Sequence, residues 1–157
     1  MHTLIPRRHA LQTLALLAAS TAFARAASSL PAVDVYKSPT CGCCGDWMKH
    51  LRANGFTDIK IHEVRDTSPW RARFRLPDKY GSCHTALIDG YVVEGHVPAR
   101  DIKKLLAERP QAVGLAAPGM PVGSPGMDGP EYNGVKDRYD VLLVDANGAA
   151  RVWARYS

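Results

Sequence analysis

A short cysteine-rich segment lies between an expected strand and an expected helix. Residues 41–44 have the sequence Cys-Gly-Cys-Cys, and the Val-Asp-Val-Tyr sequence at 33–36 before them predicts a strand that residues 38–40 end. From residue 46, apolar side chains recur at helical spacing until the Asn-Gly pair at 54–55 provides a stop signal. A strand that passes through a cysteine loop into a helix predicts a mixed α/β fold, with the thiols at the N-terminus of the helix.

The residues that follow continue the alternation of strands and helices. We expect a strand at 59–64, a short helix beginning near Thr67 or Ser68 with Pro69 in its first turn, a hairpin of 85–88 and 91–94 around Asp89-Gly90, and a helix from Pro98 to Pro110. The Asp-Gly pair between two apolar runs is the strongest local signal, because this dipeptide favours a tight hairpin turn. The predicted order of elements is therefore β-α-β-α-β-β-α.

This order resembles the thioredoxin-like arrangement, in which a cysteine motif follows the first strand and opens the first helix. The resemblance is one of pattern and covers about residues 33–109. Beyond it, residues 118–134 are rich in Gly and Pro, and a second hairpin is expected from 139–145 and 149–156. We therefore expect an α/β protein with a thioredoxin-like core and a C-terminal extension that contains a Met/Gly/Pro loop and a β-hairpin.

The first 26 residues have the composition of an export signal. Two arginines at 7–8 precede an uncharged, apolar run at 10–23, and an Ala-Arg-Ala sequence follows at 24–26. The run is too short to cross a bilayer, which takes about 20 apolar residues. We expect residues 1–26 to be removed as a signal peptide, leaving 27–157 as a single domain in the periplasm with no membrane span.

The export route and the charge of the mature chain depend on the same segment. The arginine pair resembles a twin-arginine signal, but the usual Ser before it and Phe after it are missing, so Sec export remains open as well. Removal of 1–26, which contains three arginines and no acidic residue, lowers the formal net charge from +5 to about +2. This small charge gives no indication of a nucleic-acid partner. A mature chain of about 130 residues can also fold without cysteine staples, so its four cysteines require another explanation.

The fourth cysteine, Cys83, is distant in sequence from the other three. In thioredoxin-like proteins the late hairpin begins at an X-Pro-Thr sequence that packs against the C-x-x-C pair, and Cys83-His84-Thr85 has the corresponding place here. We therefore expect Cys83 and His84 to face the cysteines of 41–44 within a few ångströms. Thiols at a helix N-terminus have lowered pKa values, and thiolates are both nucleophiles and metal ligands.

Crowded thiols favour copper among the soft metal ions. Thiolates select Cu(I), Zn(II) or iron–sulfur clusters, and thioethers point more narrowly to copper. Adjacent Cys43 and Cys44 suit one tetrahedral ion poorly. A zinc site nevertheless remains open, with the ligands Cys41, Cys44, Cys83 and His84. Because Cu(I) accepts two or three ligands and thiolates can bridge ions, we expect one or several Cu(I) ions.

Two methionines and a second histidine extend the set of candidate ligands. Met120 and Met127 lie in the Gly/Pro-rich loop, where an apolar side chain has little packing reason to be. A thioether also remains usable as a copper ligand in an oxidising compartment. His96 follows the first hairpin. The alternatives are that the methionines cover the core and that His84 and His96 are buried structural histidines.

Four motifs occur in a fixed order over nearly the whole mature chain. They are Cys-Gly-Cys-Cys-Gly followed by Trp47, Ser82-Cys83-His84-Thr85, Gly95-His96-Val97-Pro98, and the segment from Met120 to Met127. This set resembles the CopG-type periplasmic copper-resistance proteins, a family long catalogued as a domain of unknown function. The resemblance implies a thioredoxin-like fold, copper bound by the four cysteines, and a role in copper handling in the cell envelope.

Three functions remain open on the sequence alone. A copper-binding protein, with or without redox cycling of the metal, would use as ligands Cys41, Cys43, Cys44, Cys83, His84, His96, Met120 and Met127. Its partners would be copper ions and other periplasmic copper-handling proteins. A thiol–disulfide oxidoreductase would need only Cys41 and Cys44 for turnover. A zinc-stabilised binding module would unfold on chelation, and two structural disulfides are the plain alternative that an exported chain allows.

The remaining candidates are expected to be structural. Met48 lies on the same helical face as Cys44 and is expected in the core, and His50 and His62 have no supporting partners in the sequence. The basic cluster at 71–75 suggests an anionic partner or an ordinary solvated face.

Overall fold

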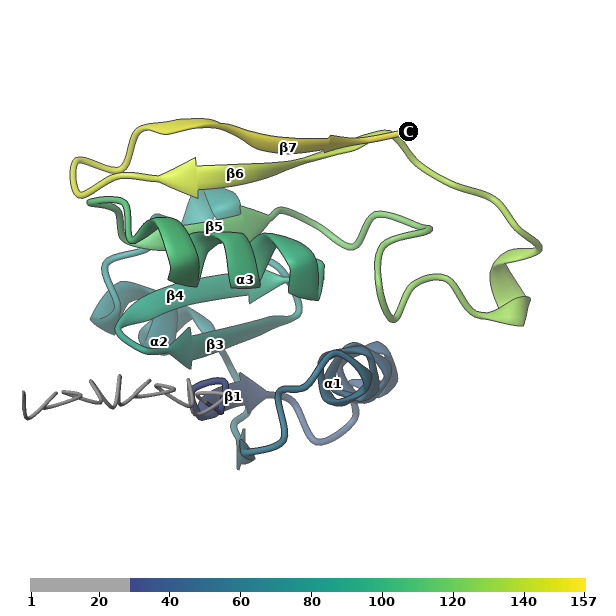
Figure 1. Ribbon diagram of the computed structural model, residues 1–157. Coiled ribbons are helices and arrows are strands. Elements are labelled where there is room, and N and C mark those ends of the chain that lie inside the picture. The colour runs from purple at the N-terminus through teal and green to yellow at the C-terminus, as the bar shows by residue number, and fades with distance from the viewer. Residues whose placement is uncertain (1–28) are drawn as a thin grey trace, which may run out of the picture.

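The computed structural model describes residues 29–157 as one seven-stranded sheet covered by helices (Figure 1). Residues 1–28 lie outside the described part, so the signal peptide expected at 1–26 stays a prediction. The elements in chain order are β1 (Val33–Lys37), α1 (Gly42–Ala53), β2 (Ile59–Glu63), α2 (Ser68–Arg73), the 3₁₀ turn η1 (Asp78–Tyr80), β3 (His84–Ile88), β4 (Tyr91–Gly95), α3 (Ala99–Glu108), β5 (Gly114–Ala117), the 3₁₀ turn η2 (Pro130–Tyr132), β6 (Tyr139–Val144) and β7 (Ala150–Tyr156). Within 29–157, no helix has the length and apolar character needed to cross a bilayer. The expected mixed α/β class is confirmed.

The first part of the chain has the predicted order β-α-β-α-β-β-α, with η1 added between α2 and β3. β1 pairs in parallel with β2 and antiparallel with β3, and β4 runs antiparallel beside β3. The β3–β4 turn has φ values of 49° at Asp89 and 85° at Gly90, the left-handed backbone that a two-residue hairpin favours. Lys37, the last residue of β1, is in register with His84, the first of β3. The loop that leaves β1 and the bend that enters β3 therefore lie at the same end of the sheet.

The C-terminal extension continues this sheet. β5 pairs in parallel with β4 and antiparallel with β6, and β6 and β7 form the predicted second hairpin, so the strand order is β2-β1-β3-β4-β5-β6-β7. The sequence analysis missed β5. Its four residues, Gly-Leu-Ala-Ala, are all buried, and a strand covered on both faces lacks the alternation that predicts an exposed strand.

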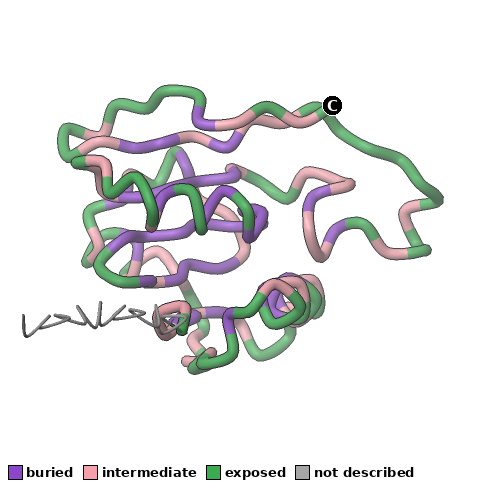
Figure 2. Tube along the Cα trace, in the orientation of Figure 1, coloured by how far each residue is buried: buried purple, intermediate pink, exposed green. Residues whose placement is uncertain are grey.

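The helices divide between the two faces of the sheet. α1 and α3 pack on one face through Trp47, Leu51, Ile102 and Leu105, which join the larger apolar core. A smaller core on the other face contains Leu76, which follows α2. Figure 2 shows buried residues along the central strands, and every residue of β4 is buried. The functional candidates lie at the end of these central strands, where α1 begins.

The loop between β5 and β6 leaves the sheet and returns past the N-terminal turn of α1 (Figure 1). Gly126 makes this approach possible. Its φ is +87°, and a Cβ atom there would lie 2.6 Å from the backbone nitrogen of Trp47 and 2.7 Å from the carbonyl oxygen of Cys43. These separations are too short for a carbon atom, so a glycine is required at the point of closest approach.

Candidate metal centre

Three of the four sulfurs belong to the start of α1. Cys41 is the N-cap residue, and Cys43 and Cys44 lie in the first turn, where unpaired backbone N–H groups and the helix dipole favour a negative charge. The first turn of α1 contains no acidic side chain, so no carboxylate competes for this environment. The helix begins at Gly42, before the apolar periodicity that starts at residue 46. The sequence pattern does not indicate this earlier start, because Cys and Gly residues contribute little to the periodicity.

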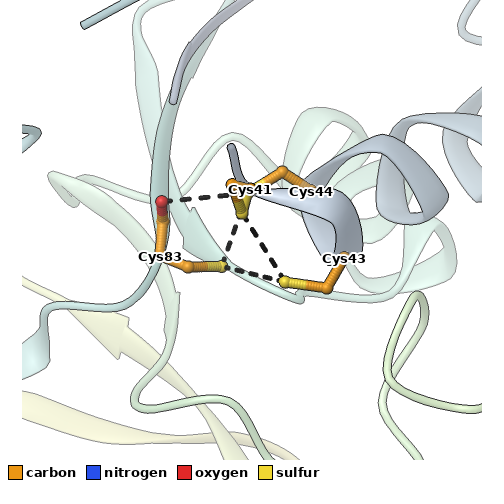
Figure 3. Close-up of side chains that lie close together, drawn as sticks. All are labelled: Cys41, Cys43, Cys44 and Cys83. Carbon is orange, nitrogen blue, oxygen red and sulfur yellow. Dashed lines mark hydrogen bonds between the residues drawn. A yellow bond between two sulfur atoms is a disulfide. The ribbon is translucent and has the colours of Figure 1, made fainter. Parts of the chain in front are cut away.

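The fourth sulfur comes from Cys83, in a bend between Ser82 and the start of β3. Its Sγ atom lies 4.0 Å from that of Cys43 and 3.7 Å from that of Cys44, and the Sγ atoms of Cys41 and Cys43 are 3.6 Å apart. All four sulfurs lie within 4.8 Å of one another (Figure 3). The structure thus brings together the four cysteines that the sequence analysis expected to converge.

Two of these cysteines are joined. Cys41 and Cys44 form a disulfide, whereas Cys43 and Cys83 are the free cysteines of the described residues. The pairing is that of a C-x-x-C motif, and it leaves the adjacent pair Cys43-Cys44 unlinked. The site therefore holds two thiols beside a disulfide, and reduction of that disulfide would give four thiols.

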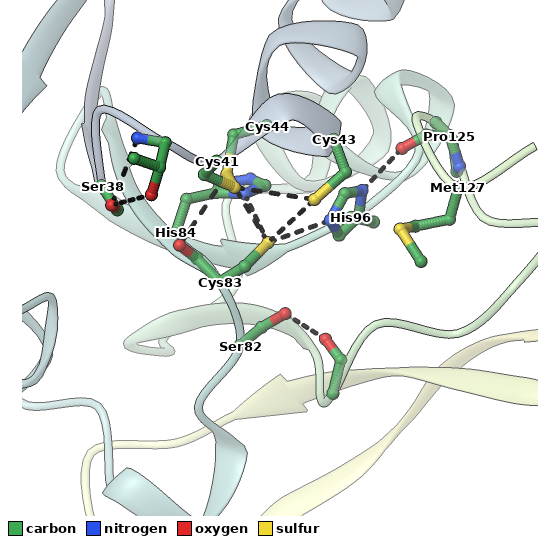
Figure 4. The surroundings of a disulfide bond; sticks show 12 residues. Ser38, Cys41, Cys43, Cys44, Ser82, Cys83, His84, His96, Pro125 and Met127 are labelled. Carbon is green, nitrogen blue, oxygen red and sulfur yellow. Dashed lines mark hydrogen bonds between the residues drawn. A yellow bond between two sulfur atoms is a disulfide. The ribbon is translucent and has the colours of Figure 1, made fainter. Parts of the chain in front are cut away.

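Two buried histidines complete a second donor group around Cys83. The Cys83 Sγ atom lies 3.3 Å from Nδ1 of His84 and 3.0 Å from Nε2 of His96 (Figure 4). His96 Nδ1 donates a hydrogen bond of 2.8 Å to the carbonyl oxygen of Pro125, which can only accept. The proton of neutral His96 is thus on Nδ1, and the lone pair of Nε2 faces the sulfur.

Burial controls the protonation of this group. Burial, followed by the nearby Cys43 thiol, raises the pKa of Cys83 to about 12, so Cys83 is a neutral thiol at pH 7. Burial also lowers the pKa of His96, and it lowers the pKa of His84 well below its usual value. Both imidazoles are therefore neutral and can act as donors, while a metal ion would have to displace the Cys83 proton.

The orientation of His84 depends on Trp47. The two rings pack at a centroid distance of 4.3 Å, and Trp47 Nε1 donates a hydrogen bond of 2.9 Å to the carbonyl oxygen of Val97. Among the described residues, Nε2 of His84 is buried without a hydrogen-bond partner. His84 is thus held by packing against Trp47 and by the contact of its Nδ1 atom with Cys83.

The two methionines of the Gly/Pro-rich loop differ in position. Met127 is buried, its Sδ atom accepts a hydrogen bond of 3.3 Å from the Tyr132 hydroxyl, and Figure 4 shows its thioether on the side of the cluster where Cys43 and His96 lie. Met120 is 52% exposed. It follows Gly119, whose backbone pairs with Ser82, next to Cys83 in the chain. The structure therefore buries Met127, next to the Gly126 that approaches Cys43, and leaves Met120 exposed.

The sequence analysis missed a buried carboxylate, Glu94, that bonds to residues on both sides of the Cys83-His84 pair. Glu94 of β4 is fully buried and bonds to Ser82, Thr85 and Arg71. Burial raises the pKa of Glu94 to about 7, although each of these partners lowers it. The signal available in the sequence was Glu94 itself, a charged residue near the end of an otherwise apolar hairpin strand. Arg71, grouped in the sequence with a solvated basic face, is instead buried against this carboxylate.

Three other candidates have structural positions, as expected. His50 Nε2 accepts a hydrogen bond of 3.1 Å from the backbone N–H of Ala99, the first residue of α3. His62 bonds to Asp34 at 2.8 Å. Met48 lies in the main core. These residues therefore stay outside both donor groups.

The donors of the site are thiols and imidazoles. One group consists of the four cysteines, and the other of Cys83, His84 and His96; within residues 29–157 these are the two clusters of three or more side chains able to hold a metal ion. Neither contains a carboxylate. Thiolate and imidazole donors fit copper or zinc and do not fit magnesium or calcium.

Comparison with known proteins agrees with this chemistry. The profile of a family described as "Protein of unknown function, DUF411" matches residues 80–127, which include Cys83, His84, His96 and both loop methionines. No curated protein sequence matches the chain. A solved structure named "Copper resistance protein copG- Form 2" is 49% identical, with a TM-score of 0.74 over 82% of this chain and 99% of the other. A second, "Copper resistance protein copG- Form 1", is 50% identical, with a TM-score of 0.73 over 81% and 98% of the two chains. With half of its residues identical over almost the whole length of these structures, the chain belongs to the CopG family of copper resistance proteins.

Proposed function

We propose that this protein binds copper as Cu(I) in the periplasm, for copper handling or resistance. The proposed ligands are Cys41, Cys43, Cys44 and Cys83, with His84, His96, Met127 and Met120. One observation carries the proposal: four sulfurs lie within 4.8 Å of one another at a helix N-terminus, and two neutral imidazoles share one of those sulfurs. Soft donors at this density favour Cu(I), which tolerates low coordination numbers and bridging thiolates.

The overlap of the two donor groups supports more than one ion per chain. Cys83 belongs both to the four-sulfur group and to the group with His84 and His96. A thiolate in that position can bridge two ions. The Nδ1 atom of His84, 3.3 Å from the Cys83 sulfur, supports a ligand role for this ring.

Redox cycling of copper is consistent with the disulfide. Binding by all four sulfurs requires reduction of the Cys41–Cys44 bond, which takes up two electrons and two protons. In the opposite direction, the two thiols can reduce two Cu(II) ions to two Cu(I) ions, forming the disulfide and releasing two protons. The step is balanced with copper itself as the oxidant, and it would leave Cys43 and Cys83 free to retain Cu(I).

The same disulfide favours a second candidate, a thiol–disulfide oxidoreductase. In that case Cys41 and Cys44 at the helix N-terminus would be sufficient for turnover. The two functions differ in their need for the other two cysteines, Cys43 and Cys83.

One double variant, Cys43→Ser/Cys83→Ser, separates the two candidates. We expect wild-type protein isolated from the periplasm to contain more than one copper ion per chain, with sulfur neighbours in X-ray absorption spectra. The variant should lose almost all of its copper and gain no zinc. Retention of full copper stoichiometry in the variant, or zinc in place of copper in the wild type, would contradict the proposal. Disulfide reductase turnover that the variant retains would support the oxidoreductase.

A further inference from the structure

A buried carboxylate holds the bend that carries Cys83. Glu94 is in register with Thr85 across β3 and β4, so their side chains share the face of the sheet opposite to that of the neighbouring His84. The Glu94 side chain has no exposed surface. Burying a carboxylate is unfavourable unless it is paired and hydrogen-bonded, and an apolar residue could fill this position without that difficulty. The contacts of Glu94 indicate what it contributes instead.

The two carboxylate oxygens bond to either side of the Cys83-His84 pair. Oε1 accepts a hydrogen bond of 2.6 Å from the backbone N–H of Ser82, and Oε2 accepts one of 2.6 Å from the hydroxyl of Thr85. The backbone pairing of β3 begins at His84, so Cys83 itself lies outside the ladder. The position of Cys83 therefore depends on contacts made by its neighbours, and one side chain makes two of them.

Arg71 fixes the carboxylate from the other side. Its Nη1 atom donates to Glu94 at 3.2 Å and to the Thr67 hydroxyl at 2.7 Å. Its other nitrogens donate to Ser68 at 2.8 Å and to Asp78 at 3.1 Å. The guanidinium group thus links the short helix α2 and η1 to Glu94, and the buried contact between Arg71 and Glu94 leaves the carboxylate little freedom to rotate.

We propose that Glu94 is a positioning residue of the metal centre, which fixes the Cys83 bend through Ser82 and Thr85 so that the Cys83 sulfur faces both the α1 cysteines and His96. The effect of Glu94 on copper binding rests on the proposed function, whereas its effect on the placement of Cys83 does not. Glu94 touches none of the donor atoms. Groups that orient metal ligands in this way commonly change metal affinity by 10–100-fold when removed.

The test uses two substitutions that weaken the hydrogen bonds between Glu94 and the residues on either side of Cys83, and one that keeps them. Thr85→Val removes the hydroxyl donor at nearly constant volume, whereas Thr85→Ser retains it and is the matched control. Glu94→Gln removes the charge at constant shape and keeps the proposal testable if Thr85→Val fails to fold. The full mature chain is used, and thermal unfolding is recorded for each variant to measure the loss of stability separately.

The first readout requires no copper. In metal-free protein with the Cys41–Cys44 disulfide intact, Cys43 and Cys83 are the free thiols, and iodoacetamide labelling of each is followed by peptide mass spectrometry. We expect the ratio of Cys83 to Cys43 labelling rates to change about fivefold in Thr85→Val and Glu94→Gln, the factor that corresponds to one lost hydrogen bond. Thr85→Ser should retain the wild-type ratio. A general loss of stability would speed the labelling of both thiols together and leave their ratio unchanged. An unchanged ratio in both Thr85→Val and Glu94→Gln would therefore overturn the proposal.

The second readout is Cu(I) affinity of the reduced protein, measured by competition with a chromogenic chelator. Thr85→Val and Glu94→Gln should each bind about tenfold more weakly than the wild type, and Thr85→Ser should bind like it. Wild-type affinity in both weakened variants would also overturn the inference. If the wild type itself binds no Cu(I), the proposed function has failed, and the labelling ratio alone decides whether Glu94 positions Cys83.

Discussion

The first turn of α1 supplies three sulfurs within four consecutive residues, whereas the fourth sulfur and both imidazoles come from the β3–β4 region, 39 residues after Cys44. The two sides are held in different ways. Cys41, Cys43 and Cys44 depend on a local helix start, while Cys83 depends on strand register, on the Glu94 carboxylate and on the pairing of Ser82 with Gly119. The comparison indicates that local helix geometry sets the spacing of the three α1 sulfurs, whereas the position of Cys83 depends on contacts between segments far apart in the chain.

The largest effect is expected from removing the sulfur that the two donor groups share. Cys83→Ser should weaken Cu(I) binding by more than about 100-fold, because both groups lose a direct ligand, whereas loss of a supporting group accounts for 10–100-fold at most. Cys43→Ser removes a sulfur from one group only and should have a smaller effect. Chelator competition measures both affinities, and circular dichroism checks that the fold persists. Equal losses in the two variants would contradict a shared role for Cys83.

A smaller effect is expected where the Met/Gly/Pro loop approaches α1. Gly126→Ala would place a Cβ atom 2.6 Å from the Trp47 nitrogen, so the loop must move and the Pro125–His96 hydrogen bond must weaken. We expect a loss of about 1–3 kcal/mol in the free energy of unfolding and about a tenfold loss in Cu(I) affinity.

Gly134→Ala is the matched control for this loop. Gly134 also has a positive φ, +74°, but a Cβ atom there would meet nothing within 4 Å. This variant should show the backbone strain without the loss of copper affinity. Denaturant unfolding and chelator competition on both variants test the prediction, which is wrong if their copper affinities fall equally.

The loop methionines should have a modest effect. Replacing Met120 and Met127 together by Leu should slow Cu(I) capture by about threefold, since the thioethers add donors to a site already dominated by thiolates. Met48→Leu is the control, because Met48 is a core methionine outside the donor groups. Stopped-flow transfer from a Cu(I) chelate measures the rates. Identical rates in the double variant and the control would indicate that both loop methionines have only a packing role.

The smallest effect is a pH dependence on the α1 side. Burial lowers the pKa of His50 from its usual 6.5, with Asp128 opposing this shift and Lys103 adding to it. The unfolded chain therefore takes up the His50 proton first as the pH falls below 6.5, so this histidine favours unfolding progressively in that range. Protonation also removes the acceptor for the Ala99 N–H.

A glutamine at position 50 can accept the same hydrogen bond without titrating. We expect the melting temperature of the wild type to fall more steeply between pH 7 and pH 5 than that of His50→Gln. The slopes contributed by His84 and His96 are common to both proteins, so the difference isolates His50. Parallel curves for the two proteins would contradict the prediction.

Much of the fold could be predicted because its signals are local. The Asp89-Gly90 hairpin, the strand before the cysteine loop and the helix after Pro98 all lie where short-range patterns indicated. β5 could not be predicted in this way, because a short strand buried on both faces has no periodicity that distinguishes it from other small apolar residues. Its place between β4 and β6 is a property of the sheet.

Part of the candidate site could be predicted from the sequence, and the rest could not be predicted for a physical reason. Cys83 and His84 could be expected near the α1 cysteines because a hairpin following the pattern of a known fold brings them there. The roles of Glu94 and Arg71 could not, since an acid and a base 23 residues apart carry no sign in the sequence that they pair in the interior. Met127 and Met120 also looked equivalent in sequence, yet Met127 is buried and Met120 is 52% exposed.

The sequence by itself determined the types of donor and their local settings: soft sulfurs at a helix start, a Cys-His pair at a strand start, and thioethers in a flexible loop. The tertiary structure decided which of them meet. It did so through the register of Lys37 with His84, the close approach that Gly126 allows, and the buried carboxylate below Cys83. Local preferences act over a few residues, whereas the distance between donors far apart in the chain depends on how strands pair and on which polar groups are satisfied when water is excluded.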